Sequence, residues 1–330
     1  MSKRFLTHGI IAALITLLAV AGCGSNRFAP AKVTLNGYTI DRDSGTVSFN
    51  LSAFNYADEL ITGGIVENPS VTITEARDAS GNRISGVSAT ARVCGNITSH
   101  DAILAVVTLD STGSMEYNDP SGLRSDAAKA FIDRLGAGDL AAVASFDTST
   151  TPTPGFSAIH IWQDFTSDKE SLKEAVDDAT FNGGGTNLWD AVVDDVDLLM
   201  TRQSSAEKVA LVLTDGADTS SSHSSAYAAD YARTNGVKVY MIGLGDPDSL
   251  DFSEMQNVAT ETGGLFAAAS DPEQLSEMFD GMFNATKASF CISVQFSVNG
   301  APPAPGTTIS GTLSFVVNKR SFDVDYTVTF

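Results

Sequence analysis

Residues 102–115 read Ala-Ile-Leu-Ala-Val-Val-Thr-Leu-Asp-Ser-Thr-Gly-Ser-Met. The first eight residues form an apolar run, as expected for a parallel strand that is covered on both faces. Asp110, Thr112 and Ser114 then place one carboxylate and two hydroxyls at alternate positions, where the strand should break into a loop. Oxygen donors at this spacing suit a hard divalent cation. Taken alone, the same composition also fills ordinary turns, so the rest of the chain has to decide between the two interpretations.

Strand and helix patterns alternate through the middle of the chain. Continuous apolar runs predict strands at 102–109, 140–146, 159–165, 209–214, 237–244 and 265–268. Helical spacing predicts helices at 127–135, 168–179 and 188–200. A last helical stripe is formed by Leu275, Met278, Phe279, Met282 and Phe283. The alternation predicts an α/β fold, a doubly wound and mostly parallel sheet with helices on both faces.

Several acids lie outside the apolar stripes of this pattern. Asp190, Asp194 and Asp197 fall on the other side of the helix predicted at 188–200. We interpret these three as a solvated helix face, which needs no binding site to explain it. Asp218 lies near the end of a predicted strand, and we interpret it as a surface acid.

Two further oxygen-bearing residues belong to loops at the same edge of the predicted sheet. Thr186 lies in the glycine-rich stretch 183–187, and Asp215 directly follows the strand at 209–214. Ligands of such sheets bind outside the carboxyl ends of the strands, so these residues can meet the loop of Asp110. No lysine follows the glycine triplet within its loop, which argues against a nucleotide-binding P-loop.

This constellation resembles the von Willebrand factor type A domain and its metal-ion-dependent adhesion site, over roughly residues 103–288. Gly-Gly-Thr-Asn at 184–187, Leu-Thr-Asp-Gly at 213–216 and Ile-Gly-Leu-Gly-Asp at 242–246 also look like segments of that family. The family's first loop reads Asp-x-Ser-x-Ser, so a threonine here replaces the middle serine and keeps its hydroxyl. The resemblance implies a metal site formed by Asp110, Thr112, Ser114, Thr186 and Asp215.

The donor types indicate what this predicted site does. Two carboxylates balance a divalent charge, while three neutral hydroxyls are weak donors and leave the ion able to accept an outside oxygen. Mg²⁺ or Mn²⁺ fits such an all-oxygen site best, whereas Ca²⁺ usually takes more carboxylate and carbonyl oxygen. The natural incoming group is a carboxylate donated by a protein partner.

The amino terminus predicts where the protein resides. Lys3 and Arg4 precede the apolar run 10–21, which is too short to span a bilayer but fits a signal peptide. Val-Ala-Gly-Cys at 20–23 resembles the bacterial lipoprotein signal, which implies a signal peptide at 1–22, lipidation of Cys23 and a tether at 23–32. The alternative is an ordinary secretory signal. We expect a protein of the bacterial cell envelope, anchored by lipid to the outer or inner membrane and facing an extracytoplasmic space.

Two cysteines remain after Cys23, and an even pair outside the cytoplasm predicts a disulfide between Cys94 and Cys291. The alternative is two separate buried thiols.

Short alternating stretches predict β-structure at 33–95 and 290–330, on either side of an α/β domain at 96–289. Either both flanks share one β-sandwich into which the α/β domain is inserted, or they form two small modules.

Charge and composition exclude several classes of function. The formal charge of −20 becomes −22 without residues 1–22, and this argues against nucleic acid as a partner. His100, His160 and His223 show no metal-ligand spacing, and no serine lies in a Gly-x-Ser-x-Gly frame, so we expect no enzyme. The leading prediction is a lipid-anchored binding or adhesion protein. The alternative is a structural subunit of an envelope complex, with a metal that only stabilises it.

Overall fold

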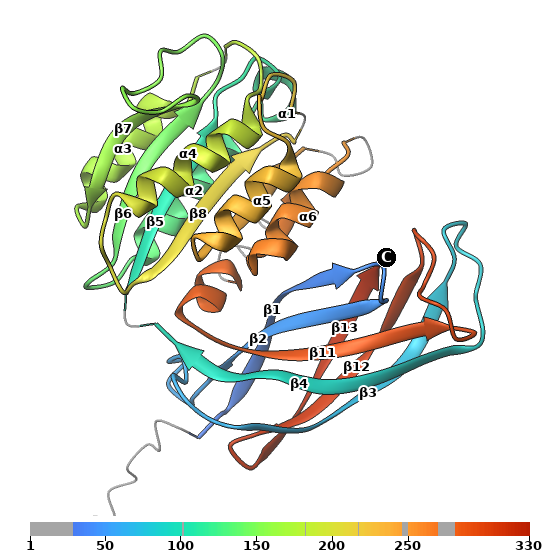
Figure 1. The fold of residues 1–330 in the computed structure, drawn as a ribbon. Helices are drawn as coiled ribbons and strands as arrows, with labels where there is room; N and C mark the ends of the chain where they lie inside the picture. Colours follow the sequence, from blue (N-terminus) through green and yellow to red (C-terminus); the bar gives the residue numbers. More distant parts are fainter. Residues whose placement is uncertain (1–28, 101, 182, 217, 246–249, 270–280) are drawn as a thin grey trace, which may run out of the picture.

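The computed structural model describes residues 29–100, 102–181, 183–216, 218–245, 250–269 and 281–330, and a six-stranded sheet forms the middle layer of its α/β unit (Figure 1). The order across this sheet is β10-β9-β8-β5-β6-β7. Its strands are β5 Ile103–Asp110, β6 Leu140–Phe146, β7 Ile159–Thr166, β8 Glu207–Thr214, β9 Val237–Leu244 and β10 Phe266–Ala269. All neighbours are parallel except β6 and β7, which are antiparallel. The predicted doubly wound, mostly parallel sheet is therefore confirmed.

Helices cover both faces of this sheet (Figure 1). Alternate residues of β5 point to opposite sides, so that Val107 packs into one apolar cluster and Val106 into another. The first cluster contains side chains of α2 Leu123–Arg134, α3 Lys169–Ala179 and the helical residues 281–287. The second contains side chains of α4 Leu188–Met200, α5 Ser225–Thr234 and α6 Ser253–Thr262.

Three helices were not predicted from the pattern: α1 Met115–Asn118, α5 and α6. The buried residues of α5 are alanines, and those of α6 are Met255, Val258 and Ala259. Both helices lack the large apolar stripe that marks α4. Of the last predicted stripe, Met282 and Phe283 pack into the first cluster. Leu275, Met278 and Phe279 lie outside the described residues.

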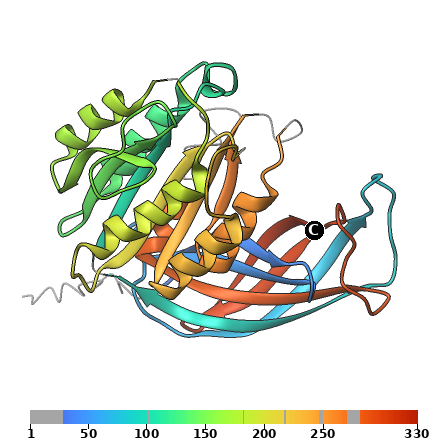
Figure 2. The ribbon, with the colours of Figure 1, turned by 45° about the horizontal axis from the view of Figure 1, so that its top comes forward.

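Both flanks of the chain contribute to one β-sandwich. One sheet has the order β1-β2-β11-β4 and the other β13-β12-β3. The strands are β1 Lys32–Asp41, β2 Thr46–Phe54, β3 Val66–Arg77, β4 Val87–Ser99, β11 Ala288–Val298, β12 Thr308–Val317 and β13 Arg320–Thr329. Their inward residues form a single apolar core, so the flanks are one sandwich and not two modules. Figure 2 shows this sandwich below the α/β unit.

The chain enters and leaves the α/β unit through two adjacent strands. Ser99 at the end of β4 pairs with Ala288 at the start of β11, and the His100 amide donates to the Lys287 carbonyl at 3.0 Å. Further along the same pair of strands, Cys94 and Cys291 form the predicted disulfide, with 5.0 Å between their Cα atoms. The bridge thus joins the two strands from which the α/β unit is inserted.

The two units also contact each other away from this junction. Arg42, after β1, donates to Gln256 of α6 at 3.3 Å. Gly281 lies against β1, where a Cβ atom would come within 2.6 Å of the Asn36 carbonyl oxygen, so a larger residue there would push the two units apart. Among the described residues, no helix is long and apolar enough to cross a membrane. Cys23 and the predicted signal peptide lie outside those residues.

Candidate metal site

The Asp110 carboxylate is completely buried at the end of β5, and protein groups hold both of its oxygens. Oδ1 accepts from the amide of Thr112 at 2.8 Å and from the hydroxyl of the same residue at 2.5 Å. Oδ2 accepts from the hydroxyl of Thr214, the last residue of β8, at 2.6 Å. Because β5 and β8 are parallel neighbours, this bond links the two strands whose ends carry the predicted carboxylates.

The hydroxyls of the first loop lie side by side. Thr112 Oγ1 is 3.2 Å from Ser114 Oγ, and Ser114 itself is exposed while Thr112 is buried. Asp110, Thr112 and Ser114 therefore present their oxygens in a sequence that runs from the interior of the sheet to its surface.

Asp215 brings the second carboxylate to the same place. Its side chain is 3 % exposed, and its Oδ2 accepts from the side-chain amide of Asn118 in α1 at 3.0 Å. Its Oδ1 is buried and has no hydrogen-bond partner within the described ranges of the chain. An unpartnered buried carboxylate oxygen is costly, because it has lost its water without gaining a donor.

Thr186 is brought to the site by contacts between three loops. The amide of Gly113 donates to the carbonyl of Gly184 at 3.2 Å, which joins the first loop to the glycine-rich loop. The Thr186 amide donates to Thr219 Oγ1 at 3.1 Å, and the Thr186 carbonyl accepts from the Thr219 amide at 2.9 Å. Gly184 has φ +66°, and a Cβ there would lie 2.7 Å from the Ser149 amide, so the loop requires glycine.

A surface depression of about 270 Å³ opens over these groups. The predicted residues Thr112, Ser114, Thr186 and Asp215 all line it, together with Asn118. Asp110 lies beneath it and reaches it through Thr112, to which it is hydrogen-bonded. The structure therefore brings all five predicted site residues to one edge of the sheet.

The electrostatics of the site favour a bound cation. Burial, and then the neighbouring charge of Asp215, raise the pKa of Asp110 to about 6. The hydrogen bonds from Thr112 and Thr214 lower this pKa but do not offset the rise, and a cation held by the two carboxylates would compensate the remaining charge. Within the described part of the chain, no group of three or more His, Cys, Asp or Glu residues could hold a metal. The two carboxylates therefore depend on hydroxyl oxygens to complete a ligand set.

Three supporting residues escaped prediction from the sequence. Thr214 and Asn118 hold the two carboxylates through the bonds described above. Arg124 is buried at the start of α2, where its Nη2 donates to the carbonyl of Phe181 at 3.0 Å and its Nε lies 3.8 Å from Asp119 Oδ2. Of these three, only Thr214 could have been suspected from the sequence, because it directly precedes the predicted ligand Asp215.

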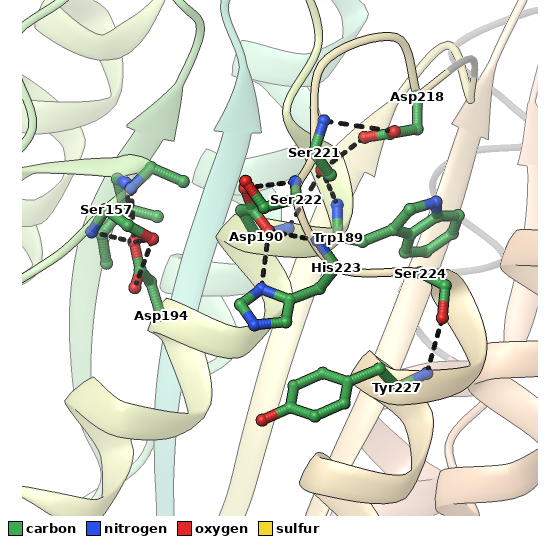
Figure 3. Close-up of polar contacts among 12 residues, drawn as sticks. Ser157, Trp189, Asp190, Asp194, Asp218, Ser221, Ser222, His223, Ser224 and Tyr227 are labelled. Carbon is green, nitrogen blue, oxygen red and sulfur yellow. Dashed lines mark hydrogen bonds and ion pairs between the residues drawn. The ribbon is translucent and has the colours of Figure 1, made fainter.

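The acids of α4 differ from the prediction of a solvated face (Figure 3). Asp194 is 4 % exposed, and its Oδ2 accepts from the backbone amides of Ser157, Ala158 and Ile159. Asp190 is 8 % exposed and accepts from the backbone and ring of His223. Both acids therefore hold loops to α4, and the prediction for them was wrong. Among the three acids predicted to be solvated, the exposed one is Asp197.

Asp218 is likewise more than a surface acid. It is half-buried, and its Oδ1 accepts from the hydroxyl of Ser221 at 2.5 Å (Figure 3). Ser221 Oγ in turn accepts from the amides of Trp189 and Asp190 at 2.9 and 3.1 Å, which are in the first turn of α4. The loop after β8 thus supplies the hydroxyl that caps α4, and this holds the loop of Asp215 next to Thr186.

The family model of the von Willebrand factor type A domain matches residues 106–281, more than half of the chain. The chain belongs to this family. Such domains generally mediate protein–protein interaction and often carry a metal-ion-dependent adhesion site. The matched region includes all five candidate site residues.

The chain is also similar, at low sequence identity, to several solved structures. Proximal thread matrix protein 1 from the mussel byssus, with a zinc-occupied adhesion-site motif, is 22 % identical over 62 % of this chain and 50 % of its own, with a TM-score of 0.47. BatB from Bacteroides thetaiotaomicron is 18 % identical over 56 % of this chain and 98 % of its own, with a TM-score of 0.45. A type A protein from Catenulispora acidiphila is 17 % identical over 92 % and 75 %, with a TM-score of 0.44. No curated protein matches the chain significantly.

Proposed function

We propose that this type A domain is a divalent-metal-dependent binding module of the bacterial cell envelope. Asp110, Thr112, Ser114, Thr186 and Asp215 would hold Mg²⁺ or Mn²⁺. The observation that carries the proposal is the buried Oδ1 of Asp215, a residue that lines the depression. Among the residues that the structure describes, this oxygen has no hydrogen-bond partner. Bound there, a divalent cation supplies charge compensation and a coordination position for an outside oxygen.

Residues of the chain orient the two carboxylates of this site and leave one side of the depression open to an outside ligand. Thr112 and Thr214 use their hydroxyls to orient Asp110, and Asn118 orients Asp215. Ser114 is exposed at the rim, so a partner's carboxylate can approach from the open side of the depression. A carboxylate is the fitting incoming group, because it adds a strong oxygen donor and a negative charge to a cation held by only two protein carboxylates.

We further propose that Cys23 is lipidated and that the protein faces an extracytoplasmic space. The start of β1 and the loops of the metal site lie at opposite ends of the molecule in Figure 1. An anchor attached ahead of β1 would therefore leave the site pointing away from the membrane. Incorporation of an alkyne fatty acid in a bacterial host tests this proposal. We expect labelling of the wild-type chain and none of Cys23→Ser, and labelling of both would contradict it.

The metal proposal is tested by calorimetric titration of the EDTA-treated full chain with Mg²⁺, Mn²⁺ and Ca²⁺. We expect Asp110→Ala to abolish Mg²⁺ and Mn²⁺ binding without unfolding the domain. Asp197→Ala removes an exposed acid of α4 and serves as the matched control, with wild-type affinity expected. Equal metal binding by wild type and Asp110→Ala would overturn the assignment of the site.

Capture of partners from envelope extracts, with and without EDTA, separates binding from a stabilising role. The proposal expects partners that are lost with EDTA and with Asp110→Ala. A large rise in melting temperature on metal addition, with no metal-dependent partner, would instead indicate a structural subunit.

We also propose that the protein is not an enzyme, and turnover in a screen of ester, peptide and phosphate substrates would contradict this.

A further inference from the structure

The loops around the candidate metal site contain more acidic than basic residues, and their one basic residue is His223. Segments 110–122, 147–158, 180–181, 183–187, 215–216, 218–224 and 250–252 all lie at the carboxyl edge of the sheet. Together they contain seven aspartates and glutamates and neither lysine nor arginine. Two of the seven are the proposed metal ligands, so most of the acidic charge at this edge belongs to other residues.

Several of these other acids face solvent beside the depression. Glu116 is exposed in α1, two residues beyond Ser114. Asp251 is exposed next to Leu250, which lines the depression. Asp218 is half-buried in the loop of Asp215. Solvent screens each of these charges, but an incoming partner experiences their sum within a Debye length of about 10 Å.

Basic residues of the α/β unit form ion pairs at the opposite edge. Lys238, at the start of β9, pairs with Glu207 at 2.6 Å, and Lys287 pairs with Asp139 at 2.5 Å. Both pairs lie near the junction with the sandwich, at the amino ends of the strands. The unit is therefore polarised. These ion pairs lie at one edge, whereas the exposed acids Glu116 and Asp251 lie at the edge that carries the site, where the buried Arg124 is beside Asp119.

An exposed aromatic ring accompanies the acids at this edge. Tyr117 is 79 % exposed and directly follows Glu116 in α1, one residue before Asn118. An open tyrosine face beside a carboxylate suits an ammonium or guanidinium group, which gains from the ring as well as from the charge. This observation is independent of the charge count and indicates the same kind of incoming group.

We propose that the partner of the metal site presents a carboxylate flanked by lysine or arginine side chains. This inference rests on the proposed function, because the metal would capture the carboxylate itself. A single divalent cation offsets only two of the acidic charges at the edge, so a uniformly acidic partner surface is repelled before it reaches the depression. Basic flanks remove this repulsion and can contact Glu116, Asp251 and the Tyr117 ring.

Immobilised peptides test the inference by surface plasmon resonance on the full chain in mild detergent, with Mn²⁺ present. The first probe is Gly-Lys-Lys-Gly-Glu-Gly-Lys-Lys-Gly. In the second probe serine replaces every lysine, and in the third glutamine replaces the glutamate. At about 20 mM salt we expect the first probe to bind roughly tenfold more tightly than the second, with an advantage that shrinks at about 300 mM. The third probe and EDTA should both abolish specific binding.

The double variant Glu116→Gln/Asp251→Asn identifies the acids responsible. We expect it to keep wild-type Mn²⁺ affinity by calorimetry while losing most of the advantage of the lysine-flanked probe. Tyr117→Leu, which keeps apolar bulk without the ring, should weaken the same probe by about twofold to fivefold.

The outcomes separate this inference from the function on which it rests. Equal, metal-dependent binding of the first two probes overturns the inference and leaves the metal-dependent function standing. The inference is also overturned if the first and third probes bind equally well with and without EDTA, since nonspecific charge attraction then explains the binding. Failure of both glutamate probes to bind in a metal-dependent way contradicts the proposed function itself.

Discussion

Thr214 donates its hydroxyl to Oδ2 of Asp110 at 2.6 Å, across the parallel strands β8 and β5. The same hydroxyl accepts from the amide of Gly216 at 3.0 Å. One buried side chain thus orients the first carboxylate of the site and shapes the turn that carries the second, Asp215. The two predicted carboxylates are coupled through a residue that is not itself a predicted ligand.

Thr214→Val should weaken metal binding while preserving the shape of the side chain. The valine cannot donate to Asp110, and loss of a group that orients a ligand typically lowers metal affinity by about 10-fold to 100-fold. Calorimetric titration with Mn²⁺ measures the change. Thr214→Ser keeps the hydroxyl and is the matched control, for which we expect near wild-type affinity. Unchanged affinity in the valine variant would show that the hydroxyl does not support the site.

Asp195 predicts a pH dependence of stability that does not involve the metal. It is completely buried and accepts from the hydroxyl of Thr108 at 2.7 Å, and its second oxygen has no partner in the part of the chain that the structure describes. Burial raises the pKa of this carboxyl well above its ordinary value. The folded state therefore favours the protonated form, and its contribution to stability is complete below pH of about 4 and is lost as the pH rises through the raised pKa.

Asp195→Asn should therefore have a higher melting temperature than wild type at neutral pH. Between pH 4 and 8 the melting temperature of the variant should fall less than that of wild type, because the variant has no carboxyl to ionise at this position. Asparagine keeps an acceptor for Thr108 and carries no charge. Thermal unfolding across this pH range, in EDTA, measures the effect. Parallel curves for wild type and variant would contradict the buried-charge explanation.

The Cys94–Cys291 bridge should stabilise the sandwich against unfolding. It closes a chain segment with a sequence separation of 197 residues. Replacing both cysteines by serine should cost about 2–5 kcal/mol of unfolding free energy, because the unfolded chain gains freedom. Urea unfolding followed by circular dichroism measures the loss. A reductant should shift wild type towards the double variant and leave the variant unchanged, whereas no shift in wild type would contradict this role.

Asp194 and Asp197 form a matched pair on one helix. Asp194→Ala leaves the amides of Ser157, Ala158 and Ile159 without their acceptor, which should cost about 3 kcal/mol of unfolding free energy. Asp197→Ala removes an exposed acid that accepts from the Tyr231 hydroxyl, and should cost less than about 1 kcal/mol. Urea unfolding compares the two. Equal losses would mean that the backbone contacts of Asp194 contribute little.

The predicted elements show where sequence patterns succeed. All six predicted strands of the central sheet are present within a few residues of their expected bounds, because long apolar runs are a local property of the chain. The helices α5 and α6 were missed, since alanine-rich packing against a sheet leaves little apolar periodicity. The environment of Asp190 and Asp194 was missed for another reason. Their partners, at 222–223 and 157–159, are more than 30 residues away in the chain.

The sequence by itself determined the α/β alternation and the cysteine pair, because each follows from local residue type and spacing. The five oxygen-bearing residues of the candidate site came from the resemblance of their motifs to the type A family. The tertiary structure alone decided that both flanks build one sandwich, and that Thr214 and Asn118 hold the two carboxylates. It also decided that Asp215 keeps a buried oxygen without a partner. Hydrogen-bond partners depend on which distant loops meet at the edge of the sheet, and no local pattern encodes that meeting.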